Sequence, residues 1–369
     1  MHLYVHIPFC HRICPYCAFF KHTPASTDMK SFIRALGREA ESRAAALDTN
    51  RGGETATLYF GGGTPSMLSD THLGHLMETL DRLVPVDKLD EFSFEANPAT
   101  FTEKKVRFWR SLGMTRVSLG VKSLDSGILH LLGREHTPAQ ALHSVEMLKN
   151  AGMPHINMDL MFAIPGQTLS IWEATLKEAV RAGTDHISAY NLTYEEDTEF
   201  FRSLLRGEKR QDPDEDAAFF ELAEHMLEAA GLRHYETSNY AREGCISPHN
   251  MAYWKGEDYV GIGPGAVSTI NGIRYSNTRD TDAYIRSTLE NGLPLSEQEP
   301  VTEEDYRLER IALMLRTDEG LPLKYILPES RPLLEQYREL GLADISPEQR
   351  LILKGRGRLL VDAIAAELC

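Results

Sequence analysis

Cys10-His-Arg-Ile-Cys14-Pro-Tyr-Cys17 places three cysteines close together, directly after the apolar run Tyr4-Val-His-Ile-Pro-Phe9. Three thiolates are one ligand short of the four that complete a tetrahedral metal site. A [4Fe–4S] cluster held by three cysteines keeps one iron open, and S-adenosylmethionine (SAM) binds such an iron through its amino and carboxylate groups. An electron from the cluster then cleaves the sulfonium and gives a 5′-deoxyadenosyl radical. The spacing therefore predicts a cluster held by Cys10, Cys14 and Cys17.

A zinc site is the alternative for these cysteines. His6, His11 and His22 are near enough in sequence to supply a fourth ligand. Structural zinc sites are usually built from two separated ligand pairs. The remaining cysteines, Cys245 and Cys369, stand alone, so no second pair exists. The pattern favours iron and sulfide over zinc.

Composition limits the class of protein. The chain has 369 residues, of which 42% are hydrophobic and 25% charged, as in ordinary globular proteins. This length suits a barrel of about 200–250 residues with an appended piece. The sequence has no long apolar run typical of a transmembrane helix and no signal peptide. A formal net charge of −15 argues against nucleic acid as the main partner. Clustered rather than paired cysteines predict a reducing, cytoplasmic location.

Strand-like and helix-like segments alternate through the first two-thirds of the chain. We expect helices after the caps Asp28 (running to about Leu47), Ser69, Thr102 and Thr137. Several helices end at a glycine before the next strand. Alternation of this kind predicts a parallel sheet, here an α/β fold with a partial (β/α)6 barrel whose chemistry lies at the C-terminal strand ends. The expected strands are Leu3–Ile7, Thr57–Phe60, Glu91–Ala96, Arg116–Val121, Ile156–Ile164 and His186–Thr193.

Three regions are expected. Residues 1–230 form the barrel, residues 231–281 a glycine- and aromatic-rich extension of strands and turns, and residues 282–369 a smaller, mostly helical C-terminal domain. Leu351–Leu360 predicts a small hairpin followed by a short helix, as in a winged helix. Given the acidity of the chain, this tail is predicted to be a packing module rather than a DNA reader.

Gly61-Gly-Gly-Thr-Pro65 follows the second expected strand, where glycines let the backbone approach a ligand closely. Carbonyls of this loop would hold the SAM amino group, although a simple tight turn has the same sequence. Glu95 ends the third strand, where an acid accepts hydrogen bonds from ribose hydroxyls. The alternative for Glu95 is a solvated strand end.

Two further charged residues lie near expected strand ends. Asp159 lies in an apolar run, and an acid buried there needs a cation, a ligand or a backbone donor as a partner. Arg134 is a candidate partner for a carboxylate, and a surface arginine near a helix end is its alternative interpretation.

His249-Asn-Met-Ala-Tyr-Trp254 combines a potential axial iron ligand with two aromatic residues that would cover a porphyrin face. A hydrogen-bonded structural histidine is the alternative. The next motif, Gly261-Ile-Gly-Pro-Gly265, lacks the spacing of a dinucleotide fingerprint and predicts a close-packed turn beneath a ligand.

These motifs in this order resemble one branch of the radical SAM superfamily, which holds the oxygen-independent coproporphyrinogen III oxidases and the related heme chaperones. The resemblance covers nearly the whole chain. It implies cluster ligation by the three cysteines. It also implies SAM contacts, some of them tied in the oxidase to a second SAM, at Tyr4, Gly61, Gly62, Gly63, Thr64, Glu95, Arg134 and Asp159. It rests on Tyr4–Cys10, Gly61–Pro65, Asp159–Met161, Pro165–Thr168 and His186–Tyr190.

Within that branch, two features favour the chaperones. The oxidases carry a fourth cysteine two residues after the third, where this chain has Phe19, and a longer segment before the motif. The motif at His249 is similar to one that marks heme chaperones. The chain departs from its relatives at Lys122, where glutamine is usual, and at Val267, where histidine is common. Lysine only donates hydrogen bonds and adds charge, so the SAM contact expected at Lys122 differs from the usual one.

The sequence therefore predicts a heme chaperone that binds a [4Fe–4S] cluster, SAM and heme, with His249 as the heme ligand. No residue is assigned a catalytic role. Expected partners are a heme-acceptor protein and an electron donor for the cluster, with peripheral membrane association and no nucleic acid. The alternatives are a true coproporphyrinogen III oxidase, which converts two propionates into vinyl groups, and another radical enzyme of tetrapyrrole metabolism such as a heme-opening methyltransferase.

Overall fold

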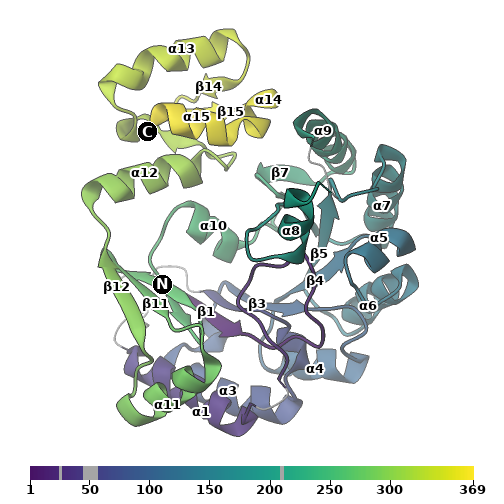
Figure 1. The fold of residues 1–369 in the computed structure, drawn as a ribbon, viewed down its shortest axis with the longest axis vertical. Helices are drawn as coiled ribbons and strands as arrows, with labels where there is room; N and C mark the ends of the chain where they lie inside the picture. Colours follow the sequence, from purple (N-terminus) through teal and green to yellow (C-terminus); the bar gives the residue numbers. More distant parts are fainter. Residues whose placement is uncertain (25–26, 45–56, 208–211) are drawn as a thin grey trace.

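Six parallel strands, β1 to β6, lie side by side in chain order at the centre of the fold (Figure 1). The computed structural model describes residues 1–24, 27–44, 57–207 and 212–369. All six expected strands are present, with ends that differ by at most two residues from prediction. Their bounds are β1 His2–Ile7, β2 Thr57–Gly62, β3 Glu91–Ala96, β4 Arg116–Lys122, β5 His155–Phe162 and β6 His186–Asn191.

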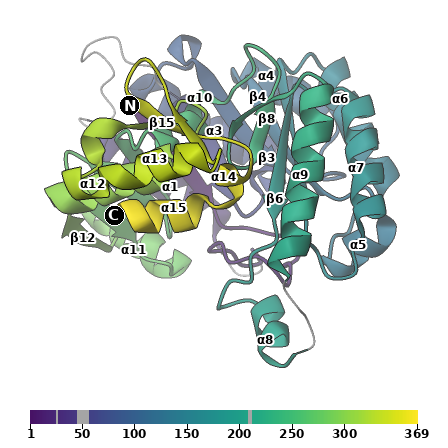
Figure 2. The same ribbon diagram turned by 90° about the horizontal axis from the view of Figure 1, so that it is seen from above.

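Helices follow these strands and cover the outer side of the sheet (Figure 1). All four predicted caps accept hydrogen bonds from the first turn of their helices. The expected end of the first helix at Leu47 lies outside the described residues; the described part of that helix ends at Ser42. The helices are α1 Met29–Ser42, α3 Asp70–Leu83, α4 Glu103–Ser111, α5 Ser126–Leu131, α6 Pro138–Asn150, α7 Leu169–Ala182, α8 Glu199–Leu205 and α9 Pro213–Ala229. Helix α8 stands out from the body of the molecule beside the N-terminal cysteine loop (Figure 2).

The two faces of the parallel sheet differ in chemistry. Alternate residues of each strand point outward and are apolar, as where Phe94 packs against Trp109 of α4 with ring centroids 4.9 Å apart. The residues between them point into the barrel and are mostly polar: Asn157 donates to Ser118 at 2.8 Å and to Ser188 at 2.9 Å. Parallel strands are usually apolar on both faces. A polar interior of this kind is suited to holding a polar ligand at its open end.

The segment after the barrel extends the same sheet on both sides. Strand β9 pairs in parallel with β1, and β8 pairs antiparallel with β6, so the full order is β12-β11-β10-β9-β1-β2-β3-β4-β5-β6-β8-β7. The prediction of strands and turns alone was wrong here, because residues 248–254 form a helix, α10, capped by Ser247. The added elements are β7 Arg233–Glu236, β8 Asn239–Ala241, α10 Pro248–Trp254, β9 Tyr259–Ile262, β10 Val267–Ile270, β11 Ile273–Asn277, α11 Thr281–Asn291 and β12 Ser296–Pro300.

The C-terminal residues gather at one end of the molecule (Figure 1) and have a hydrophobic core of their own, running from Ile311 to Leu368. The hairpin predicted within Leu351–Leu360 was placed too late, since β14 pairs with β15 and residues 356–359 are helical. The boundaries at 230 and 281 remain predictions. No described helix is long and apolar enough to cross a bilayer. The elements are α12 Glu303–Met314, β13 Leu321–Pro322, α13 Arg331–Glu339, β14 Ala343–Ile345, β15 Arg350–Leu353, α14 Arg356–Leu359 and α15 Val361–Leu368.

Candidate cofactor pocket

An open pocket of about 400 Å³ lies at the C-terminal ends of the parallel strands. The cysteine loop forms one wall, and the ends of β2 to β6 form the floor and the opposite wall. This is the position that the barrel prediction assigned to the chemistry. Among the predicted site residues, the pocket is lined by Cys10, Cys14, Cys17, Gly62, Gly63, Thr64, Glu95, Lys122, Arg134 and Asp159.

The three cysteines lie on one loop that is anchored at both ends. Cys10 N–H donates to the carbonyl of His22 at 3.0 Å, and His22 N–H donates to the carbonyl of Pro8 at 2.8 Å. All three thiols are free, and two have a donor beside the sulfur. The Thr64 hydroxyl lies 3.6 Å from Cys10 Sγ, and Arg134 Nη1 lies 3.7 Å from Cys14 Sγ. Donors of this kind also hydrogen-bond the sulfurs of bound clusters, so the loop fits an iron–sulfur cluster.

Burial raises the pKa of the Cys10 thiol, because a thiolate is poorly solvated there. The hydrogen bond from Thr64 acts in the opposite direction. A bound cluster would supply the positive charge that a buried thiolate requires.

The glycine loop passes directly under the cysteine loop. Gly63 N–H donates to the carbonyl of Ile7 at 2.8 Å. A Cβ atom at Gly63 would lie 2.7 Å from the carbonyl oxygen of Phe9, a contact that side chains do not tolerate. Glycine is therefore required at this position for the two loops to meet.

Glu95 lies at the base of the pocket, so the solvated strand end is the wrong alternative for this residue. Its carboxylate accepts hydrogen bonds from the Tyr59 hydroxyl at 2.9 Å and from Gly62 N–H at 3.1 Å. Burial and the nearby Asp159 carboxylate raise the pKa of Glu95 to about 7. Glu95 is consequently poised to change its charge near neutral pH.

The partner that the sequence demanded for Asp159 is Lys122. Lys122 Nζ lies 3.1 Å from Asp159 Oδ2, and Asp159 Oδ1 accepts from Ser118 at 2.9 Å. Lys122 has a φ of +70°, in the left-handed region that non-glycine residues rarely adopt. A bulge in the pairing of β4 with β5 accompanies this conformation and turns the lysine toward the pocket.

Arg134 lies in the pocket rather than on the surface. Its Nη2 donates to Asn97 Oδ1 and to the carbonyl of Gly120, each at 2.6 Å. Asn97 in turn donates to the Thr64 hydroxyl at 3.0 Å. Asn97 thus joins the glycine loop to the arginine, although the sequence analysis did not single it out as a site residue.

Two predicted SAM contacts, Tyr4 and Gly61, do not line this pocket. Tyr4 lies deeper in the barrel, where its hydroxyl is 3.1 Å from His6 Nδ1 and its ring stacks on Tyr59 at 6.0 Å. Gly61 faces the same rings, since a Cβ there would lie 3.0 Å from Tyr4. Tyr4 is in the middle of β1, and side chains there lie below the strand ends.

His249 also lies away from the pocket, near the N-terminal ends of β1 and β2. Its side chain is 1% exposed, and its Nδ1 is 2.6 Å from the Thr57 hydroxyl. The ring stacks on Tyr59 at 4.8 Å and meets Tyr253 edge-on at 5.1 Å. Nε2 is buried without a hydrogen-bond partner among the described residues. Burial lowers the pKa of His249 to about 3, so the imidazole is neutral.

The glycine turn at 261–265 supports the cysteine loop from below. A Cβ at Gly263, which has a φ of +105°, would lie 2.5 Å from the carbonyl oxygen of His6. One at Gly265 would lie 3.1 Å from the Phe20 ring. The turn is close-packed, as predicted, against His6 of β1 and against Phe20 of the loop that carries the cysteines.

Comparisons with known proteins agree with this geometry. Residues 4–179 match the model of the radical SAM superfamily. Heme chaperone HemW of Bacillus subtilis is 35% identical over 87% of this chain and 84% of its own length. Heme chaperone HemW of Mycobacterium tuberculosis is 36% identical over 99% of this chain and 94% of its own.

Among solved structures, coproporphyrinogen III oxidase HemN of Escherichia coli superimposes with a TM-score of 0.82 at 23% identity, covering 99% of this chain and 89% of that one. This likeness confirms the predicted fold, a radical SAM barrel with a C-terminal domain. The chain belongs to the radical SAM superfamily, in the heme chaperone branch related to oxygen-independent coproporphyrinogen III oxidase.

Proposed function

We propose that this protein binds a [4Fe–4S] cluster, SAM and heme, and that it delivers heme to an acceptor protein. Membership in the radical SAM superfamily implies the cluster and SAM. The curated relatives described above are named as heme chaperones. The observation that carries the heme proposal is the unpartnered Nε2 of His249.

The pocket suits SAM beside the cysteine loop. Glu95 offers carboxylate oxygens to ribose hydroxyls, and Arg134 and Lys122 offer positive charge to a carboxylate. A cluster at Cys10, Cys14 and Cys17 would supply an open iron and an electron. The residues of the chain itself position the nucleotide and balance its charges.

His249 has the chemistry of an axial heme ligand. An imidazole binds iron through a nitrogen lone pair, and it must be neutral to do so. The low pKa of His249 keeps it neutral across physiological pH. Its Nδ1 is held by Thr57, which leaves Nε2 as the free ligand atom. A bonded first nitrogen and a free second one are the usual arrangement of a metal-binding histidine.

Heme does not reach His249 in the conformation described, because the side chain is almost fully buried. We therefore propose that α10 moves outward when heme binds. The helix spans Pro248–Trp254, only seven residues, and joins the rest of the chain through loops at both ends. This shift would leave the strand pairing intact but would break the hydrogen bonds that Ser247 Oγ and His249 N–H donate to Glu91.

The test is a titration of the anaerobically reconstituted protein with heme, followed by absorbance in the Soret region. We expect a saturable complex whose Soret band shifts and whose affinity falls at least tenfold when His249 is replaced by alanine, as on loss of an axial ligand. His143→Ala is the matched control, because that imidazole is 66% exposed on α6 and has no proposed role.

Two results would overturn the proposal. Equal heme affinity in the wild type, His249→Ala and His143→Ala would show that His249 does not bind heme. Rapid conversion of coproporphyrinogen III into protoporphyrinogen, with SAM and a reductant, would instead establish the oxidase. Phe19 argues against the second outcome: it is 70% exposed near the pocket mouth, where the oxidases have a fourth cysteine. The acceptor protein, the electron donor, membrane association and cytoplasmic location remain part of the proposal.

A further inference from the structure

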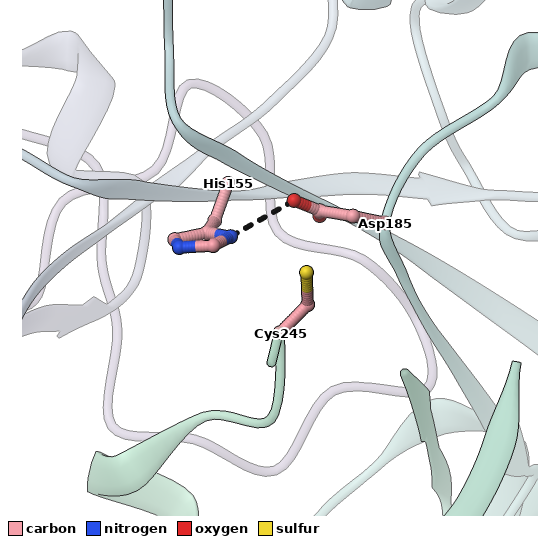
Figure 3. A group of neighbouring side chains, drawn as sticks. All are labelled: His155, Asp185 and Cys245. Atoms are coloured by element: carbon pink, nitrogen blue, oxygen red, sulfur yellow. Dashed lines mark hydrogen bonds and ion pairs between the residues drawn. The ribbon is translucent and has the colours of Figure 1, made fainter. Parts of the chain in front are cut away.

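Three potential metal ligands from separate segments meet at the end of the barrel opposite the cysteine pocket. His155 begins β5, Asp185 immediately precedes β6, and Cys245 lies in the loop before α10. Their ligand atoms all lie within 4.8 Å of one another. Figure 3 shows the three side chains pointing toward a common space, with His155 Nδ1 2.9 Å from Asp185 Oδ2. We propose that these three residues bind a divalent cation of the zinc class.

The donor set selects the cation. An imidazole nitrogen, a carboxylate oxygen and a thiolate sulfur together suit Zn²⁺, whereas Mg²⁺ and Ca²⁺ prefer oxygen alone. Zinc–ligand distances of about 2.0–2.3 Å place neighbouring ligand atoms about 3–4 Å apart, so small side-chain rotations complete the site. Three protein ligands leave the fourth tetrahedral position to water.

Neighbouring residues hold two of the three ligands, Asp185 and Cys245, in place. Asp185 Oδ1 accepts from Ile156 N–H at 3.0 Å, which leaves Oδ2 to face the imidazole and the thiol. Arg116 Nη2 donates to the carbonyls of Cys245 and Ile246 at 2.9 and 3.1 Å and so fixes the loop that carries the thiol. Supporting hydrogen bonds of this kind orient ligands in established metal sites.

The site is accessible to an ion from solution. The His155 and Asp185 side chains are 32% and 21% exposed, and Cys245 is also partly exposed. Since Cys245 precedes α10, a cation here would fasten that loop to the starts of β5 and β6. The site lies at the opposite end of the barrel from Cys10, Cys14 and Cys17, so the proposal is independent of the cluster.

The experiment uses cluster-loaded full-length protein, so that the cluster cysteines are occupied. Zinc is added, unbound metal is removed, and zinc content is measured together with X-ray absorption at the zinc edge. We expect about one zinc per chain, with one sulfur at about 2.3 Å and nitrogen or oxygen ligands at about 2.0–2.1 Å. Cys245→Ala is expected to weaken binding at least tenfold, and Asp185→Asn less.

Cys369→Ser is the matched control, because Cys369 is exposed and belongs to no cluster of ligands among the described residues; it should retain zinc. Three sulfurs at the zinc edge would place the metal in the cysteine motif and overturn the proposal. So would equal zinc content in the wild type and Cys245→Ala, or no zinc retained by the wild type. The iron content and circular dichroism of each variant show whether loss of zinc comes from a damaged fold.

Discussion

At the scale of single residues, the net charge of the pocket depends on pH. Glu95 on β3 and Asp159 on β5 are acids on either side of β4, which carries Lys122, and Lys122 bonds only to Asp159 of the two. Burial and the Asp159 charge raise the pKa of Glu95 to about 7, whereas an ordinary glutamate titrates near 4.3. The folded chain therefore binds a proton at this site more tightly than the unfolded chain, and Glu95 ionises only as the pH rises through about 7.

This titration predicts that SAM affinity depends on pH. Above about pH 7 the Glu95 carboxylate accepts hydrogen bonds from ribose hydroxyls, whereas the protonated form below that pH loses an acceptor. SAM affinity, measured by anaerobic calorimetry, should rise several-fold between pH 6 and 8. Glu95→Gln should bind weakly and show no such rise. Glu146→Gln, at an exposed position on α6, should behave like the wild type.

The same shift has a consequence for stability. Between the usual glutamate pKa and pH 7, the unfolded chain is ionised at Glu95 and the folded chain is not. The contribution of Glu95 to stability is thus greatest at low pH and falls as the pH rises through about 7. The measurement is the free energy of unfolding of the wild type minus that of Glu95→Gln, followed from pH 5 to pH 8. If this difference rose with pH, the raised pKa would be contradicted.

Lys122 supplies a second prediction at this scale. Its positive charge lowers the pKa of Glu95, opposing burial. Lys122→Gln removes that charge and keeps a hydrogen-bond donor for Asp159. The pH midpoint for SAM binding should therefore move upward. An unchanged or lower midpoint would show that Lys122 does not act on Glu95 through its charge.

At the scale of elements, α10 shows where the sequence prediction failed. Its start, Ser247-Pro248, is the same cap-and-proline signal that correctly predicted α6 at Thr137-Pro138. The helix was missed because it is short and lies among glycines and aromatic residues typical of strands and turns. The six long strands were predictable because alternating patterns and glycine stops are local signals, whereas a seven-residue helix is stabilised mainly by its packing.

The residue that caps α10, Ser247, also bonds to a buried side chain outside the helix. Ser247 accepts from Asn250 N–H at 3.3 Å and donates to the buried carboxylate of Glu91 at 2.9 Å. Ser247→Ala should lower the free energy of unfolding by about 2–3 kcal/mol, because it removes a cap and a donor to a buried charge. Ser69→Ala, which removes only the exposed cap of α3, should cost about 1 kcal/mol. Equal losses in urea denaturation would show that the bond to Glu91 adds nothing.

At the scale of the whole molecule, the sequence did not predict which distant segments of the chain lie side by side. Cysteine, glycine and acid motifs at strand ends share one pocket because parallel strands bring their C-terminal ends together. Local patterns do not reveal that β9, more than 250 residues along the chain, pairs with β1. Nor do they reveal that His249 packs below Tyr59 rather than beside the cysteines. For a related reason the motif at Tyr4 does not reveal how deep in the barrel this residue lies, and its contact with SAM stays a prediction.

A buried ion pair ties the late segments to the barrel. Arg116 Nε lies 2.6 Å from Glu91 Oε2, and both side chains are less than 5% exposed. Through Nη2 the arginine also holds the carbonyls of the loop before α10, and Glu91 accepts from Ser247. One pair on β3 and β4 therefore fixes the segment that carries both His249 and Cys245.

Arg116→Met should lower the free energy of unfolding by about 3–5 kcal/mol, because it leaves Glu91 buried without a cation. The double variant with Glu91→Met should recover much of that loss, since a hydrophobic pair of similar volume does not bury a lone charge. Recovery should be incomplete, because two loop carbonyls still lose their donor. Urea denaturation of the four proteins of this cycle measures the coupling. Strictly additive losses would show that Arg116 and Glu91 are not coupled and would contradict the expected recovery.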